Sequence, residues 1–315
     1  MAKINGVLGP LDTASLGFTL MHEHILVANW AMRQAFADWV DRDAHVVHAT
    51  AEARSAKERG VDTMVDLTPI NLGRDIHVIR EVAERAAMQV IAATGFYWTE
   101  EPWLQGWDVD RLAGYLVRDV EKGIQSTATR AGIIKCATDH LGVTDLNRKL
   151  LQASARAHRA TGVPISTHTA VAQRTGLAQQ DVFAEEGVDL TRIVIGHCGD
   201  STDIEYLEAI LRRGSFIGMD RFGVDIILPT PERVATIAEL CRRGWERQMV
   251  LSHDACCHID WFPKEMIAHM APRWNFRHIP NDVIPALRQS GVGEAQLRAM
   301  TVDNPRRIFE RQGAY

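Results

Sequence analysis

Two histidines one residue apart, His22 and His24, end the apolar segment "GFTLMHEH". If this segment is a strand, alternate side chains share a face, so both imidazoles point one way and Glu23 points the other. Neutral imidazoles placed in this way can hold a metal ion. A chain with 13 histidines can also contain such a pair by accident, so the pair is informative only if other segments supply further ligands.

Polar residues of the same kind end several other apolar segments. They are Lys135 in "GIIKCATD", His168 after "VPIST", His197 after "RIVIG", Asp220 after "SFIGM" and His253-Asp254 after "QMVLS". Either of the single histidines alone would more often be a hydrogen-bonded core residue, and Asp254 alone would more often cap a turn. At corresponding positions of separate strands they indicate a metal site, because without a cation such a group leaves costly unpaired polarity. For Asp220, a salt bridge to Arg221 and a proton-relay role are both open.

Eight short apolar segments rich in β-branched residues could position these side chains. We predict strands over residues 18–24, 62–68, 89–95, 132–138, 163–168, 192–197, 215–220 and 248–254. Helical segments such as 44–59, 144–161 and 202–213 lie between them, so the strands should be parallel with right-handed crossovers. Eight such units predict a (β/α)₈ TIM barrel, one domain over residues 1–315, with its active site at the C-terminal ends of the strands. A doubly wound open sheet is the alternative, but it usually begins with a glycine-rich phosphate turn that does not follow the first strand here.

Composition excludes several classes of function. The formal net charge of -5 gives no general attraction to nucleic acid or to anionic membranes, and no apolar run approaches the ~18 residues of a membrane span. The segment "MAKINGVLGP" lacks the apolar core of a signal peptide. Five cysteines form an odd set without the spacing of a secreted scaffold, so we expect reduced thiols and a cytoplasmic protein.

Seven segments spread between residues 17 and 309 resemble the phosphotriesterase family of the amidohydrolase superfamily, and within it the phosphotriesterase-like lactonases. They are "GFTLMHEH", "GIIKCATD", "PISTHT", "VIGHCGDSTD", "GMDRFGVD", "LSHDACC" and "DNPRRIF". The resemblance implies a binuclear metal centre at the barrel mouth and a homodimer. It also implies a metal-dependent hydrolase that acts on a small-molecule lactone or ester.

The resemblance further implies a role for each matching residue. His22, His24 and Asp254 would hold the more buried ion, His168 and His197 the more exposed one, and Lys135, as N6-carboxylysine, would bridge both together with a hydroxide. A buried lysine readily becomes neutral, which allows this modification. Tyr97 would lie over the metals and orient the substrate carbonyl, Arg221 would lie near the mouth, and Asp254 would accept the proton of the attacking hydroxide. Imidazole ligands suit zinc, our first choice, and also cobalt, manganese or iron.

Two long apolar loops, residues 223–233 and 257–276, are the candidates for substrate selection. Their side chains could line a channel for an acyl chain, pack the loop onto the barrel or form a dimer contact; they are Trp261, Phe262, Met266, Met270 and Trp274. A channel beside a small polar mouth would fit N-acyl homoserine lactones or γ- and δ-lactones, in signal degradation (quorum quenching) or in catabolism, with weak phosphotriester hydrolysis in the same site. Hydrolysis of a carboxyl ester, a carbamate or an organophosphate triester as the main reaction is the alternative.

Two departures from the family pattern bear on the substrate. Glu100 and Glu101 follow Tyr97 in "FYWTEEPWLQGW", where an aliphatic and aromatic run is usual, and His140 replaces an acidic residue. Carboxylates at the mouth would disfavour anionic substrates, whereas carboxylates facing solvent would not. A non-enzymatic barrel that kept only the fold is a third possibility, but all six ligand positions are filled.

Overall fold

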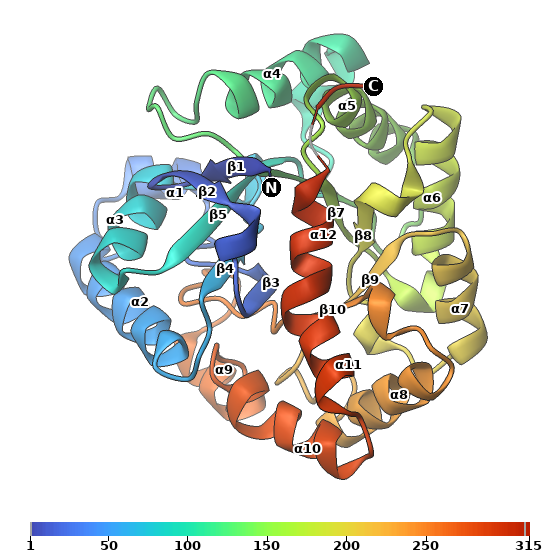
Figure 1. The fold of residues 1–315 in the computed structure, drawn as a ribbon. Helices are drawn as coiled ribbons and strands as arrows, with labels where there is room; N and C mark the ends of the chain where they lie inside the picture. Colours follow the sequence, from blue (N-terminus) through green and yellow to red (C-terminus); the bar gives the residue numbers. More distant parts are fainter. Residues whose placement is uncertain (1, 312) are drawn as a thin grey trace.

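Eight parallel strands form the centre of the molecule, in a computed structural model that describes residues 2–311 and 313–315. They follow one another around a nearly closed barrel in the order in which they occur in the chain (Figure 1). The strands are β3 (Thr19–Glu23), β4 (Thr63–Asp66), β5 (Gln89–Gly95), β6 (Ile133–Ala137), β7 (Ile165–His168), β8 (Ile193–Ile195), β9 (Phe216–Met219) and β10 (Met249–Leu251). The predicted TIM barrel is confirmed, and the open doubly wound sheet is excluded.

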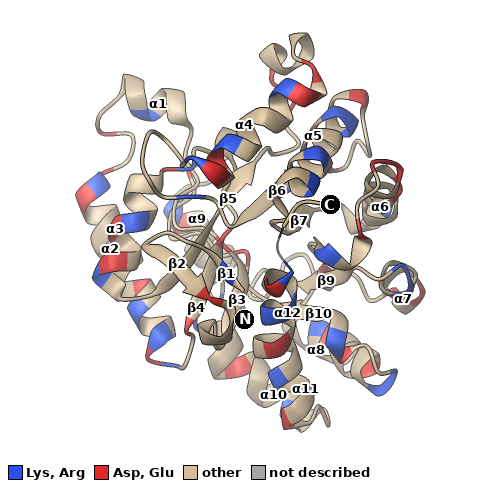
Figure 2. Cartoon of the chain, turned by 45° about the horizontal axis from the view of Figure 1, so that its top comes forward, with Lys and Arg blue, Asp and Glu red and all other residues tan. Residues whose placement is uncertain are grey.

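Helices surround the barrel and carry most of the charged side chains (Figure 2). They are α1 (Trp30–Ala35), α2 (Arg42–Lys57), α3 (Ile76–Ala86), α4 (Val109–Glu121), α5 (Asp145–Thr161), α6 (Thr175–Glu185), α7 (Ile204–Arg212), α8 (Thr230–Arg242), α9 (Lys264–Met270), α10 (Ile284–Gln289), α11 (Glu294–Arg298) and α12 (Asn304–Glu310). Helix α5 illustrates how the sequence sets their ends. The Thr144 hydroxyl accepts the Asn147 N–H at 3.1 Å at its start, and Gly162 adopts φ 79° at its end, where a residue with a Cβ would be strained.

The N-terminal end of the barrel is closed by apolar packing. Side chains from seven of the eight barrel strands form one buried cluster with Leu16 and with Ile308 and Phe309 of α12. A short antiparallel hairpin, β1 (Lys3–Gly6) and β2 (Gly9–Asp12), precedes the barrel and was not predicted from the sequence. Because this end is filled, the opposite end is the one that can open to a ligand.

The first and last strands meet mainly beyond their C-terminal ends. Asp254 N–H donates to the His22 carbonyl at 2.9 Å, and His24 N–H donates to the Ala255 carbonyl at 2.9 Å. Isolated parallel bridges join His24 to Cys256 and Val27 to Ile259. The barrel therefore closes at the level where the candidate ligands lie.

Several predicted strands were too long at this end. His24 lies just after β3, His197 lies two residues after β8, and Asp220 and Asp254 follow β9 and β10. His197 and Asp254 have φ values of 59° and 54°, which end the ladder because residues with a Cβ rarely adopt this conformation within a strand. All five cysteines are free, and no helix among the described residues is long and apolar enough to cross a membrane.

Candidate metal centre

The six predicted ligands converge at the open end of the barrel, above the C-terminal ends of β3, β6, β7, β8 and β10. Asp254, which follows the last strand, contacts both histidines of the first strand segment. Its Oδ1 lies 3.0 Å from Nε2 of His22 and 3.0 Å from Nε2 of His24. The three side chains form one compact group of potential metal ligands. As alternation along a strand requires, both imidazoles face the same way, so the predicted geometry of this pair is confirmed.

His168 and His197 face each other across a short distance. Nε2 of His197 lies 2.8 Å from Nδ1 of His168, while the other ring nitrogens bond to Asp220 and to Asp139. Burial lowers the pKa of His168 to about 4 and holds the pKa of His197 well below its ordinary value, so both rings are neutral near pH 7. Two nitrogens that each carry a lone pair therefore point at one another, an arrangement that a cation relieves.

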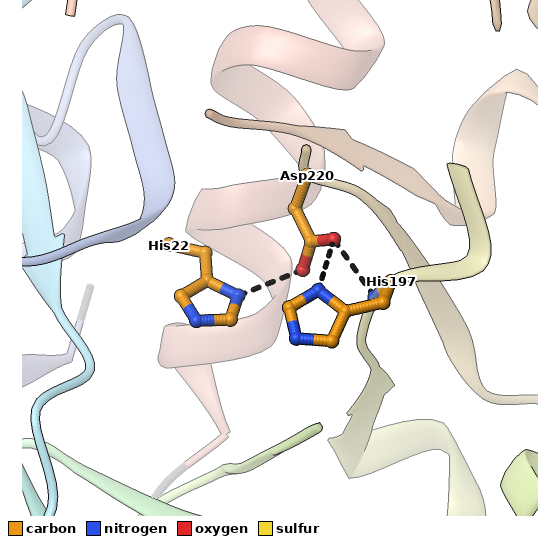
Figure 3. Close-up of side chains that lie close together, drawn as sticks. All are labelled: His22, His197 and Asp220. Atoms are coloured by element: carbon orange, nitrogen blue, oxygen red, sulfur yellow. Dashed lines mark hydrogen bonds and ion pairs between the residues drawn. The ribbon is translucent and has the colours of Figure 1, made fainter. Parts of the chain in front are cut away.

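Asp220 lies beneath the ligands and is almost fully buried. Its Oδ2 accepts from Nδ1 of His22 at 2.8 Å and its Oδ1 accepts from Nδ1 of His197 at 3.0 Å (Figure 3). Burial alone would raise the pKa of Asp220, but these histidines hold that pKa well below its ordinary value. The carboxylate therefore stays ionised. The alternative salt bridge to Arg221 is wrong, because both oxygens are committed to the histidines.

The pKa of His22 is raised rather than lowered. Burial and Lys135 lower it, but Asp254 and Asp220 outweigh them. The proton that these carboxylates favour on His22 would lie at the nitrogen that faces Asp254. A divalent cation and a proton thus compete for the same position, and the cation brings the larger compensating charge.

Lys135 has an unusual environment for a lysine. Its side chain is 1% exposed, and Nζ lies 3.0 Å from Nε2 of His22. Among the described residues, no carboxylate oxygen lies within ion-pair distance of Nζ. Burial lowers the pKa of Lys135 to about 8, which makes the neutral amine accessible near physiological pH.

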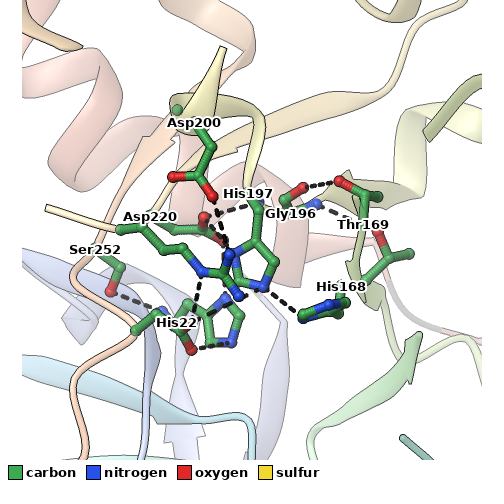
Figure 4. A network of polar contacts seen from close by, with 12 residues as sticks. His22, His168, Thr169, Gly196, His197, Asp200, Asp220 and Ser252 are labelled. Carbon is green, nitrogen blue, oxygen red and sulfur yellow. Dashed lines mark hydrogen bonds and ion pairs between the residues drawn. The ribbon is translucent and has the colours of Figure 1, made fainter. Parts of the chain in front are cut away.

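Arg221 connects the centre to a carboxylate that the sequence analysis did not single out. Its Nε donates to Oδ2 of Asp254 at 3.0 Å and its Nη1 donates to Oδ2 of Asp200 at 2.9 Å. Burial opposes the charge on Arg221, but the two carboxylates raise its pKa above the ordinary value. Asp200 is held in turn by the buried Arg233 at 2.7 Å, and Figure 4 shows the surrounding polar network. The position of Asp200, three residues after His197, was the available signal.

Glu23, the residue between the two histidines, has a separate structural role. Its buried carboxylate accepts from the Ser252 hydroxyl at 2.8 Å, from His253 Nδ1 at 2.6 Å and from the Ala255 N–H at 2.9 Å. His253 is therefore directed away from the ligand group. Glu23 joins the two residues that flank Asp254 to β3, which helps to hold Asp254 in its left-handed conformation.

A cavity of about 320 Å³ opens directly above the ligands. Tyr97 and Arg221 line its polar base, and burial raises the pKa of Tyr97, which keeps its hydroxyl protonated. The five predicted wall residues all line this cavity, with Ile226 and Ile227 from the other loop. Trp274 also donates to the His253 carbonyl at 2.9 Å, so it packs the loop onto the barrel as well.

The unusual residues 98–101, which follow Tyr97 in the loop after β5, do not line this cavity. Glu100 is exposed and accepts from the Thr144 hydroxyl at 2.7 Å, and neither Glu100 nor Glu101 lines the cavity wall. His140 is exposed and lies beside Trp98. These departures from the family pattern therefore add no side chain to the cavity wall.

The ligand chemistry fits divalent transition metals. Four imidazoles and an ionised carboxylate converge, and the outer ring nitrogens of the imidazoles are held by Asp220, Asp139 and Thr68. Outer carboxylates that orient ligand imidazoles are a usual feature of such sites. The His and Asp groups can therefore bind metal ions.

Comparisons with known proteins agree with this chemistry. Residues 2–309 match the Phosphotriesterase family. The "Phosphotriesterase homology protein" of Mycobacterium tuberculosis (strain ATCC 25618 / H37Rv) is 50% identical and covers 100% of both chains. The "Aryldialkylphosphatase" of Saccharolobus solfataricus is 38% identical over 95% of this chain and 96% of its own. A solved phosphotriesterase structure from Mycobacterium tuberculosis superposes with a TM-score of 0.97 at 50% identity, over 100% of both chains. The chain therefore belongs to the phosphotriesterase family and is a metal-dependent hydrolase.

Proposed function

We propose that the protein hydrolyses lactones that carry an apolar acyl or alkyl chain, such as N-acyl homoserine lactones or γ- and δ-lactones. The observation that carries this proposal is the position of the candidate ligand group, which forms the polar base of a cavity whose walls are otherwise apolar. A lactone combines a polar ester ring for the base with an apolar chain for the walls. Whether cleavage serves signal degradation or catabolism depends on the substrate that the cell supplies.

In this proposal two divalent ions, most fittingly zinc, occupy the centre. His22, His24 and Asp254 would hold the inner ion, and His168 and His197 would hold the outer one. Lys135 would act as a carboxylated lysine whose anionic oxygens bridge both positions. Its burial without a carboxylate partner supports this role, because a neutral amine can form the carbamate and an ammonium cannot.

When bound, such ions act as Lewis acids that polarise a carbonyl and make water nucleophilic at neutral pH. The chain's own groups would orient the substrate and move the proton. Tyr97, kept protonated by burial, would donate its hydroxyl hydrogen to the carbonyl oxygen of the ring. Asp254 lines the cavity, and its Oδ2 accepts from Arg221. It would take a proton from the attacking water and return it to the leaving alkoxide.

The apolar walls would select the substrate. Trp261 and Phe262 from one loop and Ile226 and Ile227 from the other surround the cavity without adding a charge. They would bury an acyl chain and exclude water from the polar base, which strengthens the electrostatic contacts there. The lysine and the arginine that line the cavity, Lys135 and Arg221, both lie at its base, so the walls do not favour an anionic substrate.

Hydrolysis of an organophosphate triester is a second candidate function. The relative from Saccharolobus solfataricus carries the name aryldialkylphosphatase, and its 38% identity is spread over an alignment that covers 95% of this chain. A neutral phosphotriester could place its phosphoryl oxygen where a lactone carbonyl would lie. The same ligand group serves both reactions, so only the walls and Tyr97 distinguish them.

We further propose that residues 1–315 act as one domain within a cytoplasmic homodimer. The match to the family over residues 2–309 supports the single domain. Five free cysteines support the reducing compartment. Exposed aromatic side chains, Trp30, Phe36 and Trp39 among them, support a dimer contact, which light scattering on the purified protein would measure.

A substrate panel on metal-reconstituted protein tests the proposed activity. A pH-indicator assay would compare N-acyl homoserine lactones and simple γ- and δ-lactones with an aryl ester and paraoxon. Lactone turnover with kcat/KM above ~10⁴ M⁻¹s⁻¹, well above the triester value, is the expected result. Inert lactones with a cleaved ester or triester would overturn the lactonase assignment and leave the metal-dependent hydrolase.

A further inference from the structure

Asp220 contacts histidines from both halves of the candidate ligand group, although it lies on the far side of their rings. Its Oδ1 accepts from the His197 backbone N–H at 2.8 Å and from His197 Nδ1 at 3.0 Å. Its Oδ2 accepts from His22 Nδ1 at 2.8 Å (Figure 3). One carboxylate thus receives three donors, two at one oxygen and one at the other.

These contacts fix where each imidazole carries its hydrogen. An ionised carboxylate only accepts hydrogen bonds, so Nδ1 of both rings must donate to it. In a neutral imidazole the other nitrogen, Nε2, then has the lone pair. Both Nε2 atoms point to the candidate metal centre, where His22 meets Asp254 at 3.0 Å and His197 meets His168 at 2.8 Å.

Two glycines leave the space that this carboxylate occupies. A Cβ on Gly218 would lie 2.5 Å from Oδ2 of Asp220, and a Cβ on Gly196 would lie 3.2 Å from the same atom. Any larger residue at Gly218 would have to displace the oxygen that bonds to His22. The packing around Asp220 is therefore arranged so that Oδ2 can reach His22.

We propose that Asp220 is a positioning residue that sets the tautomer of His22 and of His197, and that its two oxygens act on the two metal positions separately. Oδ2 controls the position formed by His22, His24 and Asp254, and Oδ1 controls the position formed by His168 and His197. The inference rests on the proposed binuclear centre and extends it to a residue that touches neither ion.

The unequal number of donors makes the proposal testable with one isosteric change. In Asp220→Asn the amide oxygen should take the place of Oδ1, because two N–H groups of His197 point there. The amide NH₂ then replaces Oδ2 and faces His22, which must accept at Nδ1 and carry its hydrogen on Nε2. That hydrogen points at Asp254 and blocks the inner metal position, whereas the outer position keeps its ligands.

The experiment measures bound metal and histidine tautomers in the full-length protein. Zinc content after dialysis against buffered zinc should be two equivalents per chain in the wild type and one in Asp220→Asn. Zinc affinity at the vacated position should fall at least ~10–100-fold, the range for lost outer-shell partners. Long-range ¹H–¹⁵N spectra should show His22 switching to the Nε2–H form while His168 remains metal-bound through Nδ1.

Asp119→Asn is the matched control, because it also removes a largely buried carboxylate charge. Asp119 bonds to Arg74 at 2.8 Å and to Thr94 at 2.7 Å and touches no candidate ligand. This variant should keep both zinc equivalents. Parallel circular dichroism would show that each variant is folded.

The inference would be overturned if folded Asp220→Asn bound two zinc equivalents and kept the wild-type tautomer of His22. It would also be overturned if zinc were lost equally from both positions. A wild type that binds no zinc would instead overturn the proposed metal centre, so the two failures are distinguishable. If Asp220→Asn does not fold, the spectra of the zinc-loaded wild type still decide. Hydrogens on Nδ1 of both His22 and His197 would support the inference, and an Nε2–H form at either would refute it.

Discussion

The base and the walls of the central cavity are built on opposite principles. At the base, His22, His197 and Asp220 are almost completely buried, and each polar atom has a partner or faces the candidate metal positions. In the walls, Trp261 is 49% exposed and Met266 is 42% exposed, and their side chains contribute mainly apolar surface. The base therefore depends on specific partners, whereas the walls depend on shape and on total apolar area.

This difference predicts how each region responds to substitution. A buried polar atom that loses its partner costs about 1–3 kcal/mol, and a group of such atoms fails together. A half-exposed apolar side chain contributes about 1 kcal/mol to holding a ligand and can be replaced by another of similar size. Changes at the base should alter whether the reaction occurs, and changes in the walls should alter which substrate is preferred.

Lys135→Ala is the strongest test of the base. We expect turnover to fall by at least about 10³-fold, because several kcal/mol of metal-dependent stabilisation are lost with the bridge. Zinc content should fall in the same samples, and Lys122→Ala, at an exposed lysine of the outer surface, should change neither. Full activity with full metal content in Lys135→Ala would remove the bridging role.

Tyr97→Phe tests the boundary between base and walls. The ring lies 5.0 Å from that of His168 and 5.9 Å from that of Trp261, so phenylalanine should keep the packing and lose only the hydroxyl. We expect lactone turnover to fall about 10-fold, the value of one hydrogen bond of roughly 1.4 kcal/mol. Metal content should not change. Loss of metal would mean that Tyr97 belongs to the ligand group, and the exposed Tyr115→Phe is the control.

Trp261→Ala tests the walls alone. Removal of about half of a buried indole should raise KM for long-chain lactones about fivefold and leave short-chain lactones nearly unchanged. Trp103→Ala, at a tryptophan that is 47% exposed and does not line the cavity, should leave both values unchanged. An equal effect on both chain lengths would show that Trp261 positions the reaction rather than the chain.

His158 provides a buried imidazole outside the cavity, where we expect no effect on turnover. Burial lowers its pKa to about 4, while Nδ1 and Nε2 lie 2.7 Å from the Val163 carbonyl and the Tyr315 hydroxyl. The unfolded chain therefore takes up a proton first, and the contribution of His158 to stability is complete above pH 6.5 and is lost as the pH falls towards 4. That contribution is at most about 3 kcal/mol.

Urea unfolding of wild type and His158→Gln between pH 4 and 7 measures this contribution. The free energy of unfolding should rise less steeply with pH in the variant. The difference in slope should correspond to the uptake of at most one proton on unfolding. Identical pH dependence in the two proteins would show that His158 is not the group responsible.

The barrel was predictable because its signals are local and repeated. Eight β-branched segments separated by amphipathic helices, with glycines such as Gly162 at helix ends, leave few alternatives for the chain. The hairpin at Lys3–Asp12 was missed because its strands are only four residues long and carry no clear alternation.

The side chains that meet at the open end were also predictable, since parallel strands bring their C-terminal ends together. Their roles as metal ligands stay a prediction. The residues behind them were not predictable, because contacts such as Asp220 with His22, or Asp200 with Arg221, join segments that only the closed barrel brings together. The left-handed backbone at His197 and Asp254 was equally hidden, because His and Asp adopt it more often than most residues but still only in a small minority of cases.

The seam between β3 and β10 has a consequence for biosynthesis. It joins residues 22–27 to residues 252–259, so the candidate ligands from the first strand meet Asp254 only when most of the chain is present. A nascent chain on the ribosome can place His168 and His197 long before it can place Asp254. Binding of both metal ions would therefore be among the last events of maturation, and incomplete chains would be inactive.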